Sequence, residues 1–484
     1  MSKSNKPVSM KINLILNTFL QIVNIAAPLI TAPYVSRILG VDQIGTFSYI
    51  YSLNYYFVML IGLGTTVYGM LEIAKVRDNR VKRSTAFWEI ELITVTSSVL
   101  CIAIWVVFSL MYQEYTNLMM VMILYLLAVV FDISWFFIGL ERVKYTVTIN
   151  ATMKILGVVF IFLFVNDKQD LISYTAILSS SMLLGNISMW IFIPKYIKKS
   201  EISISSIMKH FKGTMLFFIP TIATSVYMVL DKTLIGFITS SATENGYYEQ
   251  ATKVIGLVKA ITVTSFNTLI GSRMAYLYSQ KNTEDINKKR DLGIEFVMCI
   301  SVACCFGLIG ISNVFVPVFF GNEFSDASIF LILMAPLLPI MSLSNLVGNI
   351  YYNPSGQRKK SVKYLLIGCA ANIVLNLIFI PLFKGCGAVV GSIIAEALIT
   401  FMYVRFSRGF ISGRSLIKSA WKKVVAGMVI MIAVYLVGLL MGVRVITVLV
   451  QIFVGLVLYP LVLFVLKDSS LNMIEEIIKK RAAK

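Results

Sequence analysis

The chain has 484 residues, of which 58% are hydrophobic and only 14% are charged, and its formal net charge is +19. A soluble protein carries about 25% charged residues, so this composition excludes a water-soluble globular domain of this size. It predicts an all-α integral membrane protein, because a helix needs about 20 largely apolar residues to cross a bilayer and such runs recur along the chain.

Fourteen apolar runs of this kind follow one another, with short charged loops between them. We therefore expect 14 transmembrane helices, which we number as spans one to fourteen. Their approximate limits are 12–32, 45–66, 86–110, 117–138, 146–165, 171–194, 214–238, 247–270, 293–320, 328–352, 362–383, 385–404, 424–441 and 445–466.

Span one carries a row of amide side chains. Asn13, Asn17, Gln21 and Asn24 are spaced by four, four and three residues, which places them on one face of a helix. This face has two interpretations: hydrogen bonding between packed helices, worth about 0.6 kcal/mol per contact, or the wall of a polar cavity. We favour the cavity wall, and Asn17, Gln21 and Asn24 are candidate substrate-binding residues.

With Lys363, at the edge of span eleven, counted in the loop before it, four of the 43 lysine and arginine residues fall inside predicted spans: Lys154 in span five, Lys232 in span seven, and Lys253 and Lys259 in span eight. Arg37 lies just beyond the end of span one. A charge at the centre of a membrane helix costs about 2.5–3.5 kcal/mol on insertion scales. Such side chains should face water or a partner, so all five are candidate binding residues.

Acidic residues also occur within the spans, some of them near span ends. Asp231 adjoins Lys232 in the apolar stretch YMVLDKTLIGF (227–237), where it would keep Lys232 or a neighbouring cation charged and oriented. The alternative is a purely structural ion pair. Glu249 lies four residues before Lys253, so a pair within one helix is the alternative to a binding role for Lys253. The other in-span acids are Glu89, Glu91, Asp132, Glu295 and Glu396.

Span ten repeats the polar pattern of span one. Ser342, Asn345, Asn349 and Asn353 follow one another at three- and four-residue steps, again on one helix face. Asn345 and Asn349 are therefore candidate binding residues too.

The basic residues outside the spans alternate between loops. The two termini and the loops after even-numbered spans contain 35 of them, whereas the other loops contain only Arg37, Lys168, Lys384 and Arg444. Positively charged loops stay in the cytoplasm, so we expect both termini to be cytoplasmic. Because these cations are spread over short segments that face anionic lipid, no nucleic-acid partner is expected.

Two stretches share a pattern. Residues 139–165 and 356–382 both open with Gly and a basic cluster and run into an apolar helix with a central Asn. We expect two parallel six-helix lobes around a central cavity, which suits alternating access, and two further C-terminal helices. The predicted domains are an N-terminal lobe (1–200), a C-terminal lobe (201–415), and a segment (416–484) with helices thirteen and fourteen and a cytoplasmic amphipathic tail.

Cysteine and histidine indicate no reactive centre. The six cysteines lie in or at the ends of apolar helices without metal-ligand spacing, and the single histidine, His210, falls in a predicted cytoplasmic loop. No predicted outer loop is large enough for a catalytic domain. We therefore expect no metal, no cofactor and no enzymatic activity.

Four stretches together carry a family resemblance. They are APYVSRILGVDQIGTFSYIYSL (32–53), FIGLERVKYTVTIN (137–150), VLDKTLIGF (229–237) and NPSGQRKKSVKYLLIGCAANIVLNLIFIPLFKGCGAVVGS (353–392). In their order and spacing they resemble the bacterial polysaccharide-transporter (Wzx-type) flippases of the multidrug/oligosaccharidyl-lipid/polysaccharide exporter superfamily. The resemblance implies a two-lobed transporter of the plasma (inner) membrane that moves undecaprenyl-diphosphate-linked sugar repeat units outward, for capsule, O-antigen or exopolysaccharide biosynthesis. By the same resemblance, Arg37 and Asp231 occupy positions where the family often has charged residues.

The in-span cations agree with an anionic cargo. Coulomb attraction between unit charges 4 Å apart is about 4 kcal/mol at an effective dielectric near 20, so a few cations would offset the desolvation of a diphosphate, while amides bind the sugar. The expected partners are the lipid-linked oligosaccharide, membrane lipids, a coupling ion (H⁺ or Na⁺), and polysaccharide polymerase and chain-length proteins.

Two alternative functions stay open. A multidrug or cation antiporter of the same superfamily usually has a membrane carboxylate as its ion site, whereas span one here has amides and no acid. A membrane polysaccharide polymerase would need a catalytic carboxylate constellation in a large loop, and the predicted outer loops are short.

Overall fold

A computed structural model describes residues 10–260 and 273–470; the side chains of residues 10–17, 219–221 and 223–228 are excluded. Within these ranges every regular element is a helix, which confirms the predicted all-α class. The chain divides into two compact units, Met1–Thr233 and Leu234–Lys484. The predicted lobe limits remain a prediction.

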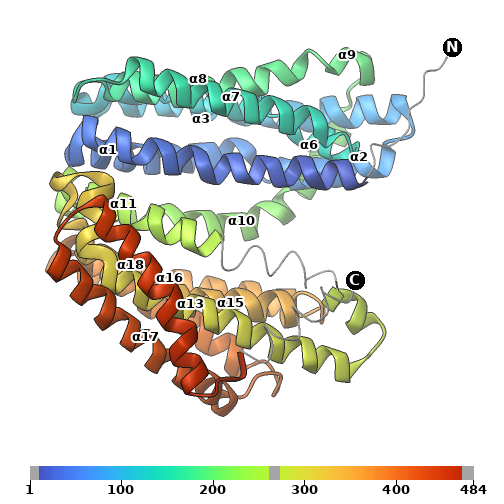
Figure 1. Ribbon diagram of the computed structural model, residues 1–484. Coiled ribbons are helices and arrows are strands. Elements are labelled where there is room, and N and C mark those ends of the chain that lie inside the picture. Colours follow the sequence, from blue (N-terminus) through green and yellow to red (C-terminus); the bar gives the residue numbers. More distant parts are fainter. Residues whose placement is uncertain (1–9, 261–272, 471–484) are drawn as a thin grey trace. The chain divides into compact units, whose positions relative to one another are not determined.

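The first unit is a bundle of long and short helices (Figure 1). Helix α1 packs against α7, α3 and α5, and α7 packs against α8. The elements are α1 (Met10–Gly62), α2 (Thr65–Val76), α3 (Arg80–Met111), the 3₁₀ turn η1 (Gln113–Tyr115), α4 (Thr116–Val121), α5 (Ile123–Val130), α6 (Ser134–Gly139), α7 (Val143–Phe164), α8 (Leu171–Trp190), α9 (Ile193–Tyr196) and most of α10 (Ile204–Thr239).

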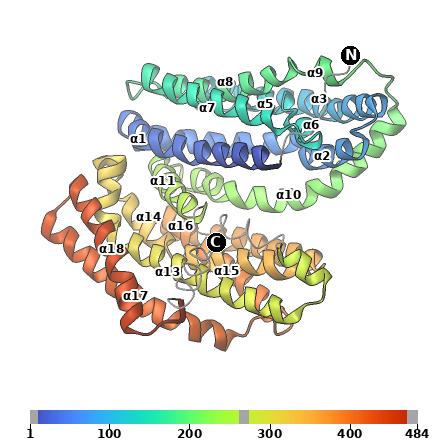
Figure 2. The same ribbon diagram turned by 45° about the vertical axis from the view of Figure 1, so that its right-hand side comes forward.

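The second unit is also helical (Figure 2). Its most extensive helix–helix packing is between α13 and α17 and between α17 and α18. Helix α15 packs on both α13 and α16. The elements are α11 (Ala242–Lys259), α13 (Thr283–Phe320), the 3₁₀ turn η3 (Asn322–Phe324), α14 (Ala327–Met334), α15 (Leu337–Val347), the π-helical turn η4 (Gly348–Tyr352), α16 (Arg358–Arg405), α17 (Gly413–Met441) and α18 (Val445–Val465).

Ten segments of the described residues are long and apolar enough to cross a membrane, judged by length and composition. The multi-pass membrane protein expected from the composition is thus confirmed, while the total of fourteen spans and the orientation of the termini stay predictions. The segments are Thr18–Val76, Arg80–Met111, Gln113–Gly139, Val143–Phe164, Leu171–Tyr196, Thr283–Phe320, Ala327–Tyr352, Arg358–Arg405, Gly413–Met441 and Val445–Val465.

Two of the helices contain a break in their backbone. At 1.5 Å per residue the 53 residues of α1 would extend about 80 Å, more than twice the roughly 30 Å of a bilayer core. The backbone leaves the helical region at Gly40 (φ 76°, ψ 176°), between predicted spans one and two, and glycine tolerates this positive φ. Lys384 (φ 52°, ψ −133°) interrupts α16 between predicted spans eleven and twelve.

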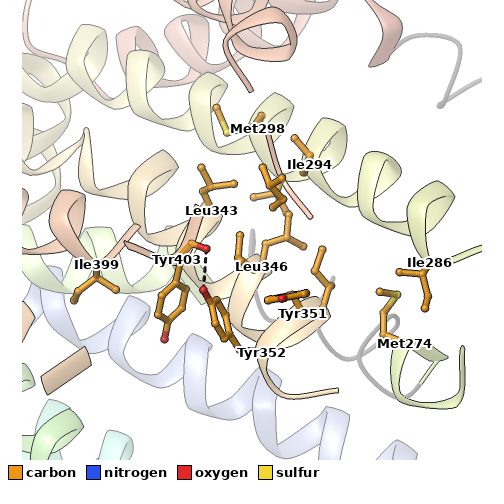
Figure 3. Close-up of a cluster of buried hydrophobic side chains, with 14 of the residues drawn as sticks. Met274, Ile286, Ile294, Met298, Leu343, Leu346, Tyr351, Tyr352, Ile399 and Tyr403 are labelled. Atoms are coloured by element: carbon orange, nitrogen blue, oxygen red, sulfur yellow. Dashed lines mark hydrogen bonds between the residues drawn. The ribbon is translucent and has the colours of Figure 1, made fainter. Parts of the chain in front are cut away.

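Each unit has its own hydrophobic core. In the first unit, Phe87 of α3 stacks on Trp135 of α6 with ring centroids 5.5 Å apart, inside a cluster that also includes residues of α2 and α8. In the second unit, Leu346, Tyr352 and Tyr403 belong to a cluster contributed by α13, α15, η4 and α16 (Figure 3). The Tyr352 hydroxyl donates to the Tyr403 carbonyl at 3.1 Å, so this buried polar group is satisfied inside the core.

The segment that joins α8 to α10 is bound along the start of α3. This segment, residues 194–203, therefore belongs structurally to the first unit. The described residues hold it with six hydrogen bonds: Arg80 Nη2 to the Pro194 carbonyl (3.3 Å), Arg83 Nη2 to the Tyr196 carbonyl (2.7 Å), Lys198 N–H to Ser84 Oγ (3.0 Å), Trp88 Nε1 to the Lys198 carbonyl (3.3 Å), Ser203 N–H to Glu89 Oε1 (3.2 Å) and one between the Thr85 and Ser200 hydroxyls (2.5 Å).

Candidate functional site

The first unit brings two of the predicted binding residues together. Lys154 of α7 donates from Nζ to Asn24 Oδ1 of α1 at 2.9 Å. Gln21 and Asn24 are both exposed, so the amide row of α1 is not sealed between packed helices at these positions. The side chain of Asn17 lies outside the described residues. The binding roles of all three amides stay predictions.

The partner of Lys154 is electrically neutral. Among the described residues, the ion pairs and hydrogen bonds of this unit place no carboxylate against Lys154 Nζ, whose partner is the Asn24 amide oxygen. An amide orients an ammonium group but does not cancel its charge. Lys154 is therefore a cation that an anionic ligand would neutralise.

The charged stretch near the end of α10 is partly buried. Asp231 is 6% exposed, Lys232 is partly exposed, and both make interactions within the folded protein. The next residue, Thr233, is hydrogen-bonded to Ser52 Oγ at 2.8 Å and to the Tyr56 hydroxyl at 3.1 Å. These bonds fix this part of α10 against the second half of α1.

The remaining candidate of this unit, Arg37, is exposed on α1 three residues before the break at Gly40. It too takes part in an interaction within the protein. Its role as a binding residue stays a prediction.

In the second unit the predicted lysines have acidic neighbours. Lys253 Nζ lies 3.3 Å from Glu249 Oε1 on α11, so the pair within one helix, which the spacing offered as the alternative to a binding role, is present. Lys259 Nζ contacts the sulfur of Met341 in α15 at 3.9 Å, and the carboxylate of Glu396 in α16 acts on it electrostatically. These two cations are therefore better compensated than Lys154.

The amides predicted in span ten satisfy part of their polar groups locally. Asn345 Nδ2 donates to the Met341 carbonyl at 2.7 Å, and Asn349 Oδ1 accepts from Asn353 Nδ2 at 3.1 Å. Asn345 and Asn349 are both partly exposed. Lys259 and Asn345 thus both contact Met341, which places two predicted binding residues at one point where α11 meets α15.

One buried charge cluster was missed from the sequence. Lys423, which charge counting assigned to a cytoplasmic loop, lies in α17 with a fully buried side chain, so its placement in a loop is wrong, while the side of the membrane stays a prediction. Its Nζ is 2.6 Å from Glu295 Oε2 of α13, 3.2 Å from Asp468 Oδ1 after α18, and 2.7 Å from the Ser419 carbonyl. Because Glu295 and Asp468 are 128 and 45 residues away, no local spacing could have indicated this cluster.

His210 was also misplaced by the sequence analysis, which put it in a loop. It lies in α10, where Nδ1 is 2.8 Å from the Tyr68 hydroxyl and Nε2 is 3.2 Å from Glu89 Oε2. Glu89 is 3% exposed, so His210 is the partner of a buried carboxylate.

Known proteins resemble this chain in sequence. A protein of Escherichia coli (strain K12) named "Putative O-antigen transporter" is 26% identical over 418 residues, which cover 83% of this chain and 97% of the relative. A protein of Haloferax volcanii named "Probable low-salt glycan biosynthesis flippase Agl15" is 25% identical over 187 residues, which cover 38% of this chain and 39% of the relative.

Solved structures share the fold. The inward closed conformation of the lipid II flippase MurJ superposes with a TM-score of 0.74 at 16% identity, covering 93% of this chain and 97% of that structure. An inward-facing transporter of the multidrug resistance MATE family, in the MOP superfamily, gives a TM-score of 0.60 at 12% identity over 82% of this chain and 96% of that structure. At these identities the likeness concerns the fold alone.

A family model gives the assignment. The model described as "Polysaccharide biosynthesis protein" matches residues 11–270, which is more than half of the chain. This match includes both helices of the Asn24–Lys154 contact and the α3 segment that holds residues 194–203. The resemblance to polysaccharide transporters drawn from sequence stretches is thereby confirmed at the level of the family: the chain belongs to the polysaccharide biosynthesis protein family.

Proposed function

We propose that this protein is a flippase of the plasma membrane that moves undecaprenyl-diphosphate-linked oligosaccharide repeat units outward by alternating access, for the synthesis of a cell-surface polysaccharide. In this proposal it has 14 transmembrane helices, of which twelve form two six-helix lobes and two follow at the C-terminal end. Both termini lie in the cytoplasm. Family membership and the name of the Escherichia coli relative support the class of cargo.

The observation that carries the proposal is the Asn24–Lys154 contact. A carrier of a diphosphate needs a positive charge that is held in place, yet not already neutralised by a carboxylate. Lys154 meets both conditions, since Asn24 orients it at 2.9 Å and leaves its charge uncancelled. A phosphate oxygen at about 4 Å from Nζ would gain about 4 kcal/mol at an effective dielectric near 20.

The other predicted residues have complementary roles in this proposal. Exposed Gln21 and Asn24 would bond the hydroxyl groups of the sugar, together with Asn345 and Asn349. The cations with acidic neighbours would exchange those neighbours for phosphate when cargo arrives. The set proposed to bind cargo is Asn17, Gln21, Asn24, Arg37, Lys154, Asp231, Lys232, Lys253, Lys259, Asn345 and Asn349.

The proposed system has further partners. An inward gradient of H⁺ or Na⁺ would drive the exchange. A polysaccharide polymerase and a chain-length protein would then consume the cargo on the outer face.

The experiment uses a strain that lacks the gene and measures lipid-linked oligosaccharide in each leaflet. Loss of the flippase should make complete repeat units accumulate in the cytoplasmic leaflet, and the wild-type gene should clear them. Lys154→Gln should fail to clear them, while Lys154→Arg should retain much of the activity because guanidinium also pairs with phosphate.

Lys144→Gln is the matched control, because Lys144 is exposed at the start of the same helix and should tolerate the loss of its charge. Accumulation of unpolymerised units on the outer face of the deletion strain would instead indicate a polymerase. Normal clearance by Lys154→Gln, at equal protein level, would refute the role given to Lys154.

A further inference from the structure

Two glutamates on α3 have opposite environments although they lie two residues apart. Glu89 and Glu91 are each only 3% exposed. Because successive residues of a helix turn by about 100°, their side chains leave α3 in directions about 160° apart. The two carboxyl groups therefore meet different neighbours.

Glu89 is a paired carboxylate. Its Oε2 lies 3.2 Å from His210 Nε2, and its Oε1 accepts a hydrogen bond from the Ser203 N–H at 3.2 Å. His210 is oriented in turn by the Tyr68 hydroxyl, 2.8 Å from Nδ1. Both oxygens of Glu89 thus have donors, which makes its negative charge tolerable in a buried place.

Glu91 has the same burial, but one of its two oxygens has no donor. Within the described part of the chain its Oε1 has no hydrogen-bond partner. The nearby charged side chain is Asp132, also an acid, which follows α5, and α5 packs on α3. Asp132 lies between α5 and α6, is partly exposed, and accepts the Ser134 N–H on Oδ1 at 2.9 Å.

The surroundings of Glu91 make an ionised state costly. An isolated carboxylate in an apolar interior loses its hydration and takes up a proton instead, and a second carboxyl group nearby strengthens this effect. A proton bound to Glu91 removes the cost. Ca²⁺ or Mg²⁺ would need about six or more oxygen ligands, and the described residues contain no group of three His, Cys, Asp or Glu side chains that could hold a metal ion.

We propose that Glu91 and Asp132 form a proton-binding site within the first unit, in which Glu91 holds the proton and the partly exposed Asp132 is the group through which it enters and leaves. Glu89 takes no part, because His210 and Ser203 already satisfy it. The binding itself is independent of the cargo. Its use as the site through which a proton gradient drives transport rests on the proposed function.

The test measures the protonated carboxyl group directly in the purified full-length protein. In infrared spectra recorded at neutral pH, the wild type should show the carbonyl stretch of a protonated buried carboxyl group. Glu91→Gln should remove that band, because glutamine is a neutral mimic of protonated glutamate. Glu89→Gln is the matched control and should retain it, and Asp132→Asn should shift it.

Two results would overturn the site. One is a band of unchanged intensity in Glu91→Gln, measured on protein that melts at the wild-type temperature. The other is loss of the wild-type band when sodium replaces choline in the buffer, since sodium would then be the occupant.

Transport is measured separately in proteoliposomes that carry a pH gradient. Glu91→Gln should lose at least a tenfold stimulation of flipping by the gradient. A wild type that shows the infrared band but flips no lipid-linked oligosaccharide would refute the proposed function and leave the proton site intact. Equal stimulation of wild type and Glu91→Gln would refute the coupling role.

Discussion

The substitution Lys423→Met should destabilise the second unit more than any single change on its surface. The lysine side chain is 0% exposed, and its Nζ reaches Glu295 at 2.6 Å and Asp468 at 3.2 Å. Methionine fills similar space but supplies no charge, so both carboxylates lose their cation. Removing one partner of a buried ion pair costs about 3–5 kcal/mol.

That cost converts into a measurable shift of the melting temperature. For a unit of about 250 residues, 1 kcal/mol corresponds to about 2 °C or more, so the loss should be about 6–10 °C. Thermal unfolding of the purified protein in detergent, followed by intrinsic fluorescence, provides the measurement. Lys418→Met is the control, because Lys418 is exposed on the same helix and should melt within about 1 °C of the wild type.

A further variant separates lost charge from lost packing. The triple change Glu295→Gln, Lys423→Met and Asp468→Asn leaves no unpaired ion, so it should recover a large part of the lost stability. If Lys423→Met melts like Lys418→Met, or if the triple variant melts no higher than Lys423→Met, then the cluster does not stabilise α13, α17 and the chain after α18 in the way proposed.

Three other perturbations have defined outcomes. Burial acts to raise the pKa of Asp468, but the hydrogen bonds from its neighbouring serine and the nearby lysine charge outweigh burial and lower that pKa. The stabilising contribution of Asp468 is therefore present above the unfolded pKa of about 3.9 and is lost as the pH falls through the lower folded value. Asp468→Asn should flatten the acid limb of the melting temperature plotted against pH. An unchanged acid limb would contradict this. Cysteine at exposed Lys198 should be protected in intact cells from an impermeant thiol reagent, whereas cysteine at exposed Gln169 should react, and the reverse labelling would invert the predicted orientation. Asn24→Leu should leave the protein inserted but lower transport several-fold, because Lys154 loses the oxygen that orients it; normal flipping per inserted molecule would show that the amide is dispensable.

Local spacing allowed part of this structure to be predicted. Runs of apolar residues predicted the helices. The break at Gly40 falls between two predicted spans, at a residue type that tolerates a positive φ. The Glu249–Lys253 pair followed from a spacing of four residues on one helix. Each of these features depends on residues that are close in sequence.

Contacts between segments far apart in sequence could not be predicted from local spacing. Charge counting placed Lys423 in a loop, since nothing near it in sequence shows that Glu295 and Asp468 surround it. The same limit applies to Glu89 and Glu91, which look alike in sequence. Only the packing of α10 on α3 shows that one of them has His210 as its partner.

The bonds between α3 and residues 194–203 have a consequence for the order in which the protein assembles during synthesis. A nascent chain that ends at residue 200, the predicted limit of the first lobe, would contain buried Glu89 before Ser203 and His210 had been made. The first unit therefore reaches its full set of contacts only when translation has passed the first turns of α10. Complementary fragments expressed from two genes should accordingly be divided after α10, whose last residue is Thr239, and not in the segment that precedes it.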